Sequence, residues 1–251
     1  MFKTLLARAR QGYRTTGFPA EEPSMPPLFR GRPKLGPEAN PAAFALYAEL
    51  CPTGALSVAE AGPEIDLGRC VFCQDCVAAS PEAGVTFTRD WRLATTRRGG
   101  LVLAGDETPD VTALDRELRR LLGRSLRLRQ ISAGGCNGCE VEVNALGNIV
   151  FDAGRFGIEF VASPRHADGI LVTGPVTRNM RDALLIAYEA IGEPRLVIAA
   201  GACAISGGLY RGHDEICDGI EDLLPVDLYV PGCPPHPVTI LDGLLRLLGR
   251  S

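Results

Sequence analysis

The chain has 251 residues and a net charge of −4, with 46% apolar and 22% charged residues, which is the composition of a folded globular protein. The acidic balance and the 6% content of aromatic residues argue against nucleic acid as a partner, because binding would need a basic surface or stacking platforms. No apolar run approaches the ~20 residues needed to cross a bilayer, so we expect one large or two ordinary globular domains.

The first 40 residues predict a docking segment. The opening sequence MFKTLLARARQGYR is basic and amphipathic, which favours a short helix that binds a partner or a membrane surface. It lacks the apolar core and cleavage site of a secretory signal. Residues 17–40 are rich in proline and glycine and should run extended over a surface. The alternative is a frayed, solvated tail.

Residues 41–103 predict a compact region with strand-like stretches. These stretches are ALSV, VTFT and LVLA. Residues 104–110 follow as a linker, and Asp110 could cap a helix that runs through VTALDRELRRLLG and ends at Gly123.

After residue 125 the pattern changes to alternating strands and helices. Apolar runs that end in glycine predict buried parallel strands, and the segments RDALLIAYEAI and PVTILDGLLRLLG have helical periodicity. Alternation of this kind predicts a doubly wound parallel sheet, in which ligands bind beyond the carboxyl ends of the strands. The predicted strands are LRLRQI, GILVTG, RLVIAAG and VDLYVPG.

The chain has nine cysteines. Without an export signal a disulfide framework is not expected, and clustered cysteines indicate metal ligands. Cys70, Cys73 and Cys76 have the C-x2-C-x2-C spacing of an iron–sulfur loop. In two-cluster ferredoxins the fourth cysteine of each run ligates the other cluster. Cys51, which precedes Pro52, is therefore the expected fourth ligand.

An internal repeat supports this assignment. CPTGALSV aligns with SPEAGVTF, which places Pro41, Phe44, Tyr47 and Ser80 at the ligand positions of a second cluster. None of the first three can serve as a ligand. We therefore expect one complete 4Fe–4S cluster and one deleted cluster, with Phe44 and Tyr47 filling the vacated space. The alternatives are a zinc site on the same four cysteines, or Ser80 as an unusual fourth ligand.

A second set of cysteines follows the predicted parallel strands. Cys136 and Cys139 lie in a glycine-flanked CxxC at a helix start, and Cys203 and Cys233 follow later strands. The four should meet at one edge of the sheet, where helix amides stabilise negative charge. The alternative is a thioredoxin-like redox pair at Cys136 and Cys139 with the other two buried. Cys217 has no such context and is expected to pack as a small core residue.

These residues carry a resemblance to known proteins. From about residue 120 onward the chain resembles the small electron-transfer subunit of membrane-bound group 4 NiFe hydrogenases of the formate hydrogenlyase type, which is related to the 20-kDa subunit of complex I. Residues 1 to about 103 resemble the ferredoxin-like subunit of the same complexes. The matching stretches are GRSLRLRQISAGGCNGCEVE, RFGIEFVASPRHADGILVTGPVT, GACAISGG and VPGCPPHP, and MFKTLL, PPLFRGRPKL, LCPTGALSV and IDLGRCVFCQDC.

The resemblance implies a fusion of two neighbouring subunits. Its implied fold class is α/β: a small degenerate ferredoxin-like α+β domain followed by a doubly wound, flavodoxin-like domain. The expected boundaries are 1–40 for the docking segment, 41–103 for the ferredoxin-like domain, 104–124 for a linker and helix, and 125–251 for the hydrogenase-like domain.

The resemblance also implies that Cys136, Cys139, Cys203 and Cys233 hold a proximal 4Fe–4S cluster next to a catalytic large subunit. Two details favour a hydrogenase over complex I. Asn137 and Gly138 separate the first two cysteines, which are typically adjacent in complex I, and His166 stands where complex I subunits tend to have a glutamine. Glu140 could pass protons at the large-subunit interface, or could simply favour the first helical turn.

The implied function is an electron-transfer subunit with two 4Fe–4S clusters and no turnover alone. The implied partners are a hydrogenase large subunit, membrane-embedded subunits of the proton-translocating type and an electron-donor or acceptor oxidoreductase, on the cytoplasmic face of the cell membrane. One alternative is the same role in a complex without a NiFe site that reduces quinone. The other is a zinc-stabilised scaffold with no redox role.

Overall fold

The computed structural model describes residues 2–36, 39–79, 84–122 and 125–250. Within these residues the α-helices are Phe2–Gln11 (α1), Pro41–Leu50 (α2), Asp75–Ala79 (α3), Arg116–Leu122 (α4), Gly138–Ala145 (α5), Arg178–Glu189 (α6), Ala202–Ser206 (α7) and Pro237–Leu247 (α8). The strands are Pro33–Leu35 (β1), Leu56–Ala59 (β2), Gly62–Asp66 (β3), Val85–Phe87 (β4), Val102–Leu103 (β5), Leu126–Ser132 (β6), Ile158–Phe160 (β7), Gly169–Thr173 (β8), Leu196–Ala200 (β9) and Leu228–Val230 (β10). Short 3₁₀ helices are Arg98–Leu101 (η2), Ala153–Phe156 (η3), Pro164–His166 (η4) and Gly208–Tyr210 (η5).

The second half of the chain forms a parallel sheet. Its strand order is β10-β9-β8-β6-β7, and every pairing in it is parallel. When the strands are numbered by their appearance within the sheet, this is the order 2-1-3-4-5 of flavodoxin-like folds. The predicted parallel sheet is confirmed. The chain reverses its direction of winding between β6 and β8, which is where ligands bind in such sheets.

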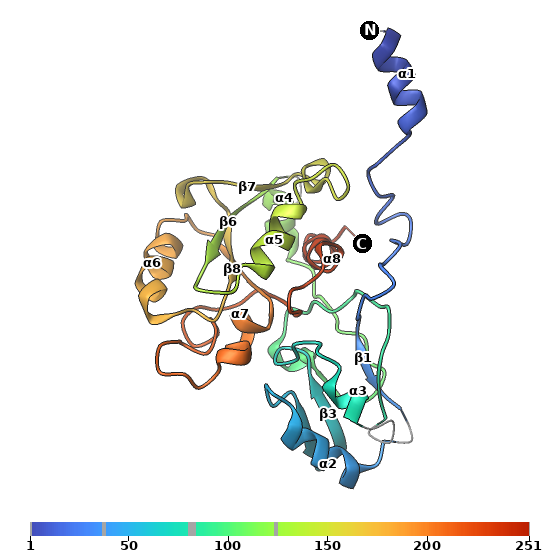
Figure 1. The fold of residues 1–251 in the computed structure, drawn as a ribbon. Helices are drawn as coiled ribbons and strands as arrows, with labels where there is room; N and C mark the ends of the chain where they lie inside the picture. Colours follow the sequence, from blue (N-terminus) through green and yellow to red (C-terminus); the bar gives the residue numbers. More distant parts are fainter. Residues whose placement is uncertain (1, 37–38, 80–83, 123–124, 251) are drawn as a thin grey trace.

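Both faces of this sheet are covered, which explains why β8 and β9 are buried along their whole length. Leu171 and Ile198 point into the core cluster that also contains residues of α5 and α8. Their neighbours Ile170 and Val197 point into the opposite cluster, with residues of α6 and α7. Because side chains alternate along a strand, each strand supplies both cores. Figure 1 shows α6 and α8 on opposite sides of the sheet.

The region before residue 104 contains two small antiparallel sheets. One pairs β1 with β4, and the other has the order β2-β3-β5. Asn40 caps α2 by accepting hydrogen bonds from the amides of Ala42 and Ala43. Phe44 on α2 is completely buried in the core cluster of this region. The three expected strand stretches correspond to β2, β4 and β5.

The helix expected from Asp110 is shorter than predicted. Helix α4 begins at Arg116, and Asp115 caps it by accepting hydrogen bonds from the amides of Glu117 and Leu118. Val111 is buried instead of helical, and Leu114 donates its amide to the carbonyl of Leu247 at the end of α8. The capping prediction for Asp110 was therefore wrong, and Gly123 lies outside the described residues.

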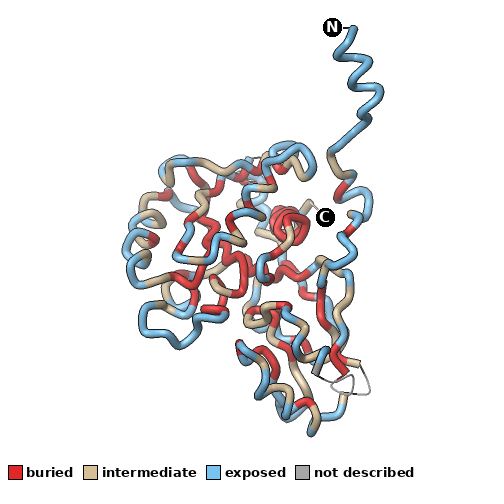
Figure 2. The backbone as a smooth tube through the Cα atoms, in the orientation of Figure 1, coloured by how far each residue is buried: buried red, intermediate tan, exposed pale blue. Residues whose placement is uncertain are grey.

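Helix α1 projects from the body of the protein, and none of its residues is buried (Figures 1 and 2). The segment that follows binds the body at several points. Thr16 donates its amide to the carbonyl of Val150, and Arg155 donates to the carbonyl of Phe18, whose side chain is buried in the core. The segment after α1 therefore follows the surface of the body. No helix among the described residues has the length and apolarity required to cross a bilayer.

Candidate metal centres

The structure brings the first set of four cysteines together. Cys51 ends α2, Cys76 lies on α3, and Cys70 and Cys73 lie on the loop that precedes α3. All four line one mainly apolar pocket with Tyr47, Leu56 and Phe87 among its walls. The three closely spaced cysteines and the distant Cys51 therefore line a single pocket.

Backbone amides face the sulfur atoms of this first group. The amide of Ala55 donates to Cys51 Sγ at 3.3 Å, and the amide of Phe72 donates to Cys70 Sγ at 3.4 Å. Phe72 and Gln74 have φ values of 56° and 72°, in the left-handed region that side-chain-bearing residues rarely adopt. This backbone turns the loop tightly around its cysteines.

Three thiols of the first group, those of Cys70, Cys73 and Cys76, have a raised pKa and are harder to ionise than free cysteine. Burial raises the pKa of Cys70 to about 12. The hydrogen bond from the Phe72 amide opposes this rise, and the charges of the neighbouring thiols add to it. Burial and the charges of Cys73 and Cys51 raise the pKa of Cys76 to about 11. Burial also raises the pKa of Cys73. The thiolate forms would therefore need a bound cationic centre to offset burial.

The second set of four cysteines lies at the carboxyl ends of three strands of the parallel sheet. Cys136 and Cys139 follow β6, Cys203 follows β9, and Cys233 follows β10. The charge of each of the other three thiols contributes to the raised pKa of Cys139, after burial as the largest cause. The four therefore lie at one edge of the sheet.

Two glycines allow the close packing of this second group. Gly201 has a φ of 93°, and a Cβ atom there would lie 2.5 Å from Cys139 Sγ. Gly208 has a φ of 58°, and a Cβ atom there would lie 2.7 Å from Cys203 Sγ. Burial, followed by the charges of Cys233 and Cys136, raises the pKa of Cys203 to about 11. Only glycine fits where these sulfur atoms approach the backbone.

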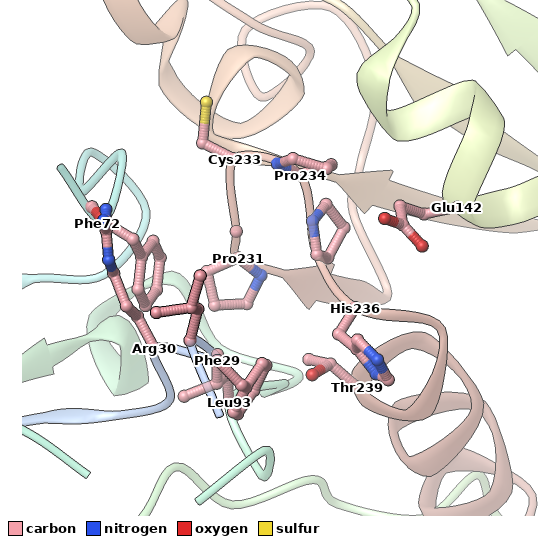
Figure 3. Close-up of a pocket in the computed structure, with 13 residues that line it drawn as sticks. Phe29, Arg30, Phe72, Leu93, Glu142, Pro231, Cys233, Pro234, His236 and Thr239 are labelled. Atoms are coloured by element: carbon pink, nitrogen blue, oxygen red, sulfur yellow. The ribbon is translucent and has the colours of Figure 1, made fainter. Parts of the chain in front are cut away.

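The two groups of cysteines adjoin one another. Burial raises the pKa of Cys233, and the charges of Cys136 and then Cys73 add to the rise. A pocket of about 270 Å³ separates their loops, with Phe72 on one wall and Cys233 on another. Figure 3 shows Arg30, Phe29 and His236 around the same pocket.

Glu140 lies next to Cys139 at the point where the sheet reverses its winding. One carboxylate oxygen, Oε1, accepts hydrogen bonds from Ser132 Oγ at 2.6 Å and Thr173 Oγ1 at 2.7 Å. Ser132 and Thr173 end β6 and β8, and Glu140 is only 6% exposed. The carboxylate thus joins the ends of two strands behind the second cysteine group, a role that the sequence alone did not indicate.

Other residues singled out in the sequence lie elsewhere. Cys217 is partly buried and packs against one of the two large core clusters, in agreement with its expected role as a core residue. Ser80 lies outside the described residues. Sequence reasoning missed Arg30, which binds the first cysteine loop, and no pattern around it signalled that contact.

Each group has a donor set whose chemistry fits an iron–sulfur cluster. Such clusters take cysteine thiolates as ligands and are tuned by amide hydrogen bonds and burial, and both features surround these thiols. Among the described residues, no three His, Cys, Asp or Glu side chains lie close enough around one point to hold a single metal ion. In the first group the four thiols line one pocket, and in the second the four cysteines follow the carboxyl ends of three strands of one sheet.

Known proteins match the second half of the chain. Residues 136–247 match the protein family described as "NADH ubiquinone oxidoreductase, 20 Kd subunit". Formate hydrogenlyase subunit 7 of Escherichia coli (strain K12) is 44% identical over 141 residues, which are 55% of this chain and 54% of that protein. This chain therefore spans about half the length of that relative.

Two further relatives come from different complexes. The probable membrane-bound hydrogenase subunit mbhJ of Pyrococcus furiosus is 41% identical over 134 residues, which are 53% of this chain and 80% of that protein. A subunit of the NADH-quinone oxidoreductase of Citrifermentans bemidjiense is 48% identical over 109 residues, which are 43% of this chain and 64% of that protein. The chain thus belongs to the family of the 20-kDa subunit of NADH–ubiquinone oxidoreductase, whose members are subunits of oxidoreductases.

Proposed function

We propose that this chain is the iron–sulfur electron-transfer subunit of a membrane-associated, NiFe hydrogenase-like complex. It would hold two 4Fe–4S clusters, one on Cys51, Cys70, Cys73 and Cys76 and one on Cys136, Cys139, Cys203 and Cys233. The observation that carries the proposal is the arrangement of eight cysteines in two groups of four, one lining a single pocket and the other at the carboxyl ends of three strands of one sheet.

When bound, each cluster would supply one-electron redox chemistry. The residues of this chain hold the thiols in place and surround them with apolar walls such as Leu56 and Phe87. Amides at Ala55 and Phe72 donate to sulfur, which favours the more reduced and more negative state of a cluster. The chain would thus set the position and potential of its clusters and would have no turnover alone.

The proposal includes a fusion of two subunits. The region 41–103 would be a degenerate ferredoxin-like domain, after a docking segment at 1–40, and 125–251 would be the hydrogenase-like domain, joined through 104–124. Two helix–strand units support a repeat, because α2 is followed by Cys51 and β2, and α3 is followed in turn by β4. Phe44, fully buried between these elements, would occupy the space of the deleted cluster.

The partners would be a hydrogenase large subunit, membrane-embedded subunits of the proton-translocating type and an electron donor or acceptor. The carboxyl edge of the parallel sheet, where the second cysteine group lies, is the surface that would face the large subunit. Helix α1 exposes Phe2, Leu5 and Leu6 beside basic residues, which suits peripheral binding at the cytoplasmic face of a cell membrane.

A second candidate is the same relay in a complex that reduces quinone and has no NiFe site. It is favoured by the similarity to an NADH-quinone oxidoreductase subunit. The large subunit distinguishes the two, because a NiFe site requires terminal CxxC pairs in that chain. Isolation of the intact complex and sequencing of its large subunit decides between them.

Substitution of single cysteines tests the two-cluster proposal. Cys76→Ser should remove the EPR signal of one cluster and leave the other, and Cys139→Ser should do the reverse. Cys217→Ser is the matched control and should leave both signals unchanged, because Cys217 is not one of the eight proposed ligands and packs as a core residue. Loss of both signals on either single substitution would contradict independent sites, and a colourless zinc protein would support the scaffold alternative instead.

A further inference from the structure

Two adjacent residues, Phe29 and Arg30, contact the loops that carry the two cysteine groups. The ring of Phe29 packs edge-on against His236, with 5.4 Å between ring centroids, and His236 follows the Cys233 loop at the start of α8. Arg30 Nη1 donates to the carbonyl oxygens of Phe72 at 2.6 Å and Cys73 at 3.3 Å. Figure 3 shows Phe29 and Arg30 beside the pocket between these loops.

The carbonyl groups that Arg30 binds belong to a backbone that needs support. Phe72 and Gln74, on either side of Cys73, both have left-handed φ values. Residues with side chains keep such a conformation only where their surroundings fix it. Phe72 is 8% exposed and its ring packs against Phe87, which anchors one side of the loop. Arg30 holds the other side through a charge-assisted hydrogen bond.

The chain immediately after Arg30 is itself firmly held. The amide of Gly31 donates to the carbonyl of Thr88 at 2.8 Å, and the amide of Arg32 donates to the carbonyl of Asp90 at 2.9 Å. A Cβ atom at Gly31 would lie 2.3 Å from the Asp90 carbonyl oxygen, so the two backbones are in close contact. Phe29 and Arg30 therefore extend from a fixed point toward both cysteine loops.

We propose that Phe29 and Arg30 are positioning residues that set the separation between the Cys70–Cys76 loop and the Cys233 loop, and with it the coupling between the two clusters. This inference rests on the proposed function. An electron that leaves one reduced cluster must tunnel to the other, and tunnelling weakens steeply as the gap widens. The pair would act on the loops that carry the ligands, because Arg30 donates to the carbonyls of the first loop and the Phe29 ring packs against His236, which follows the second.

EPR spectroscopy of the fully reduced protein, isolated within its complex, tests the inference. Two paramagnetic clusters that lie close together split each other's signals, and the splitting reports their separation. We expect Arg30→Gln to keep the iron and sulfide content of the wild type and to lose this splitting. Arg30→Lys should restore it, because an ammonium group can donate to the same two carbonyls. Arg181→Gln is the matched control, since Arg181 is exposed on α6 and pairs with its neighbour Asp182.

The outcomes separate this inference from the proposed function. A wild-type protein that holds fewer than two clusters contradicts the proposed function and the inference with it. Two clusters in Arg30→Gln with the splitting unchanged overturn the inference alone. If Arg30→Gln fails to retain the first cluster, Phe29→Ala decides, because it leaves the Arg30 bonds in place. Weaker splitting in that variant supports the inference, and unchanged splitting overturns it.

Discussion

Gly201 shows how closely a single residue can constrain the second cysteine group. Its φ of 93° and ψ of 154° fall in a region that is essentially restricted to glycine. The space that a side chain would fill is taken by Cys139 Sγ. Gly201 therefore lets two strand-to-helix connections approach each other at the carboxyl edge of the sheet.

We expect Gly201→Ala to lower the free energy of unfolding by about 1–3 kcal/mol, because the new methyl group combines backbone strain with a clash against sulfur. Denaturation in urea measures this. Gly99→Ala is the control, since a Cβ atom there meets no atom within 4 Å, and it should change stability by less than about 0.5 kcal/mol. Equal effects of the two substitutions would show that the close approach to Cys139 is not required.

At the scale of residues, the grouping of the cysteines could be predicted from the sequence much better than the contacts around them. Spacing and the Cys-Pro repeat identified Cys51 as a partner of the 70–76 run, and the structure places it in the same pocket. Cluster spacing is a local property of the chain and can be recognised directly. The contacts of Arg30 and Glu140 connect residues that are distant in sequence, and no local pattern records them.

The N-terminal cap of helix α8 depends on the protonation state of His236. His236 Nδ1 accepts a hydrogen bond from the amide of Val238 at 3.2 Å and so caps the helix. Burial lowers the pKa of His236 below its ordinary value. Folding thus favours the neutral ring. Its contribution to stability is present above the unfolded pKa of about 6.5 and is lost as the pH falls through the lower pKa of the folded state.

His236→Asn should remove this pH dependence, because asparagine caps helices without titrating. We expect the free energy of unfolding of the wild type to fall relative to the variant as the pH is lowered from about 7 to about 5. Denaturant titrations at several pH values provide the comparison. Parallel profiles for the two proteins would show that the cap does not depend on a neutral His236.

Elements with a continuous apolar run or a clear helical period could be predicted, whereas strands without such a pattern could not. Strands β8 and β9 are continuous apolar runs, and α6 and α8 have a clear helical period. Strands β3 and β7 gave no such signal. The first contains Pro63 and Glu64, and the second has only three residues, so tertiary pairing decides both.

The start of α4 was misplaced for a related reason. Either Asp110 or Asp115 could cap a helix in this stretch, because aspartate is a favoured N-cap residue. Burial of Val111 and the hydrogen bond from Leu114 to the end of α8 keep the intervening chain out of a helix. Tertiary contacts therefore selected the later aspartate.

For the molecule as a whole, helix α1 should contribute to membrane association and not to the stability of the fold. None of its residues is buried, so removal of residues 2–11 should change the free energy of unfolding by less than about 0.5 kcal/mol. The same deletion should weaken the association of the complex with membranes, because exposed Phe2 and Leu5 are lost. Membrane sedimentation measures this, and undiminished sedimentation would contradict a docking role.

The central claim concerns the number of clusters that this chain holds. Quantification of iron and acid-labile sulfide in the purified wild-type protein tests it directly. The account predicts roughly eight iron and eight sulfide per chain, in two 4Fe–4S clusters. A protein that contains zinc without sulfide, or sulfide for a single cluster only, would contradict it.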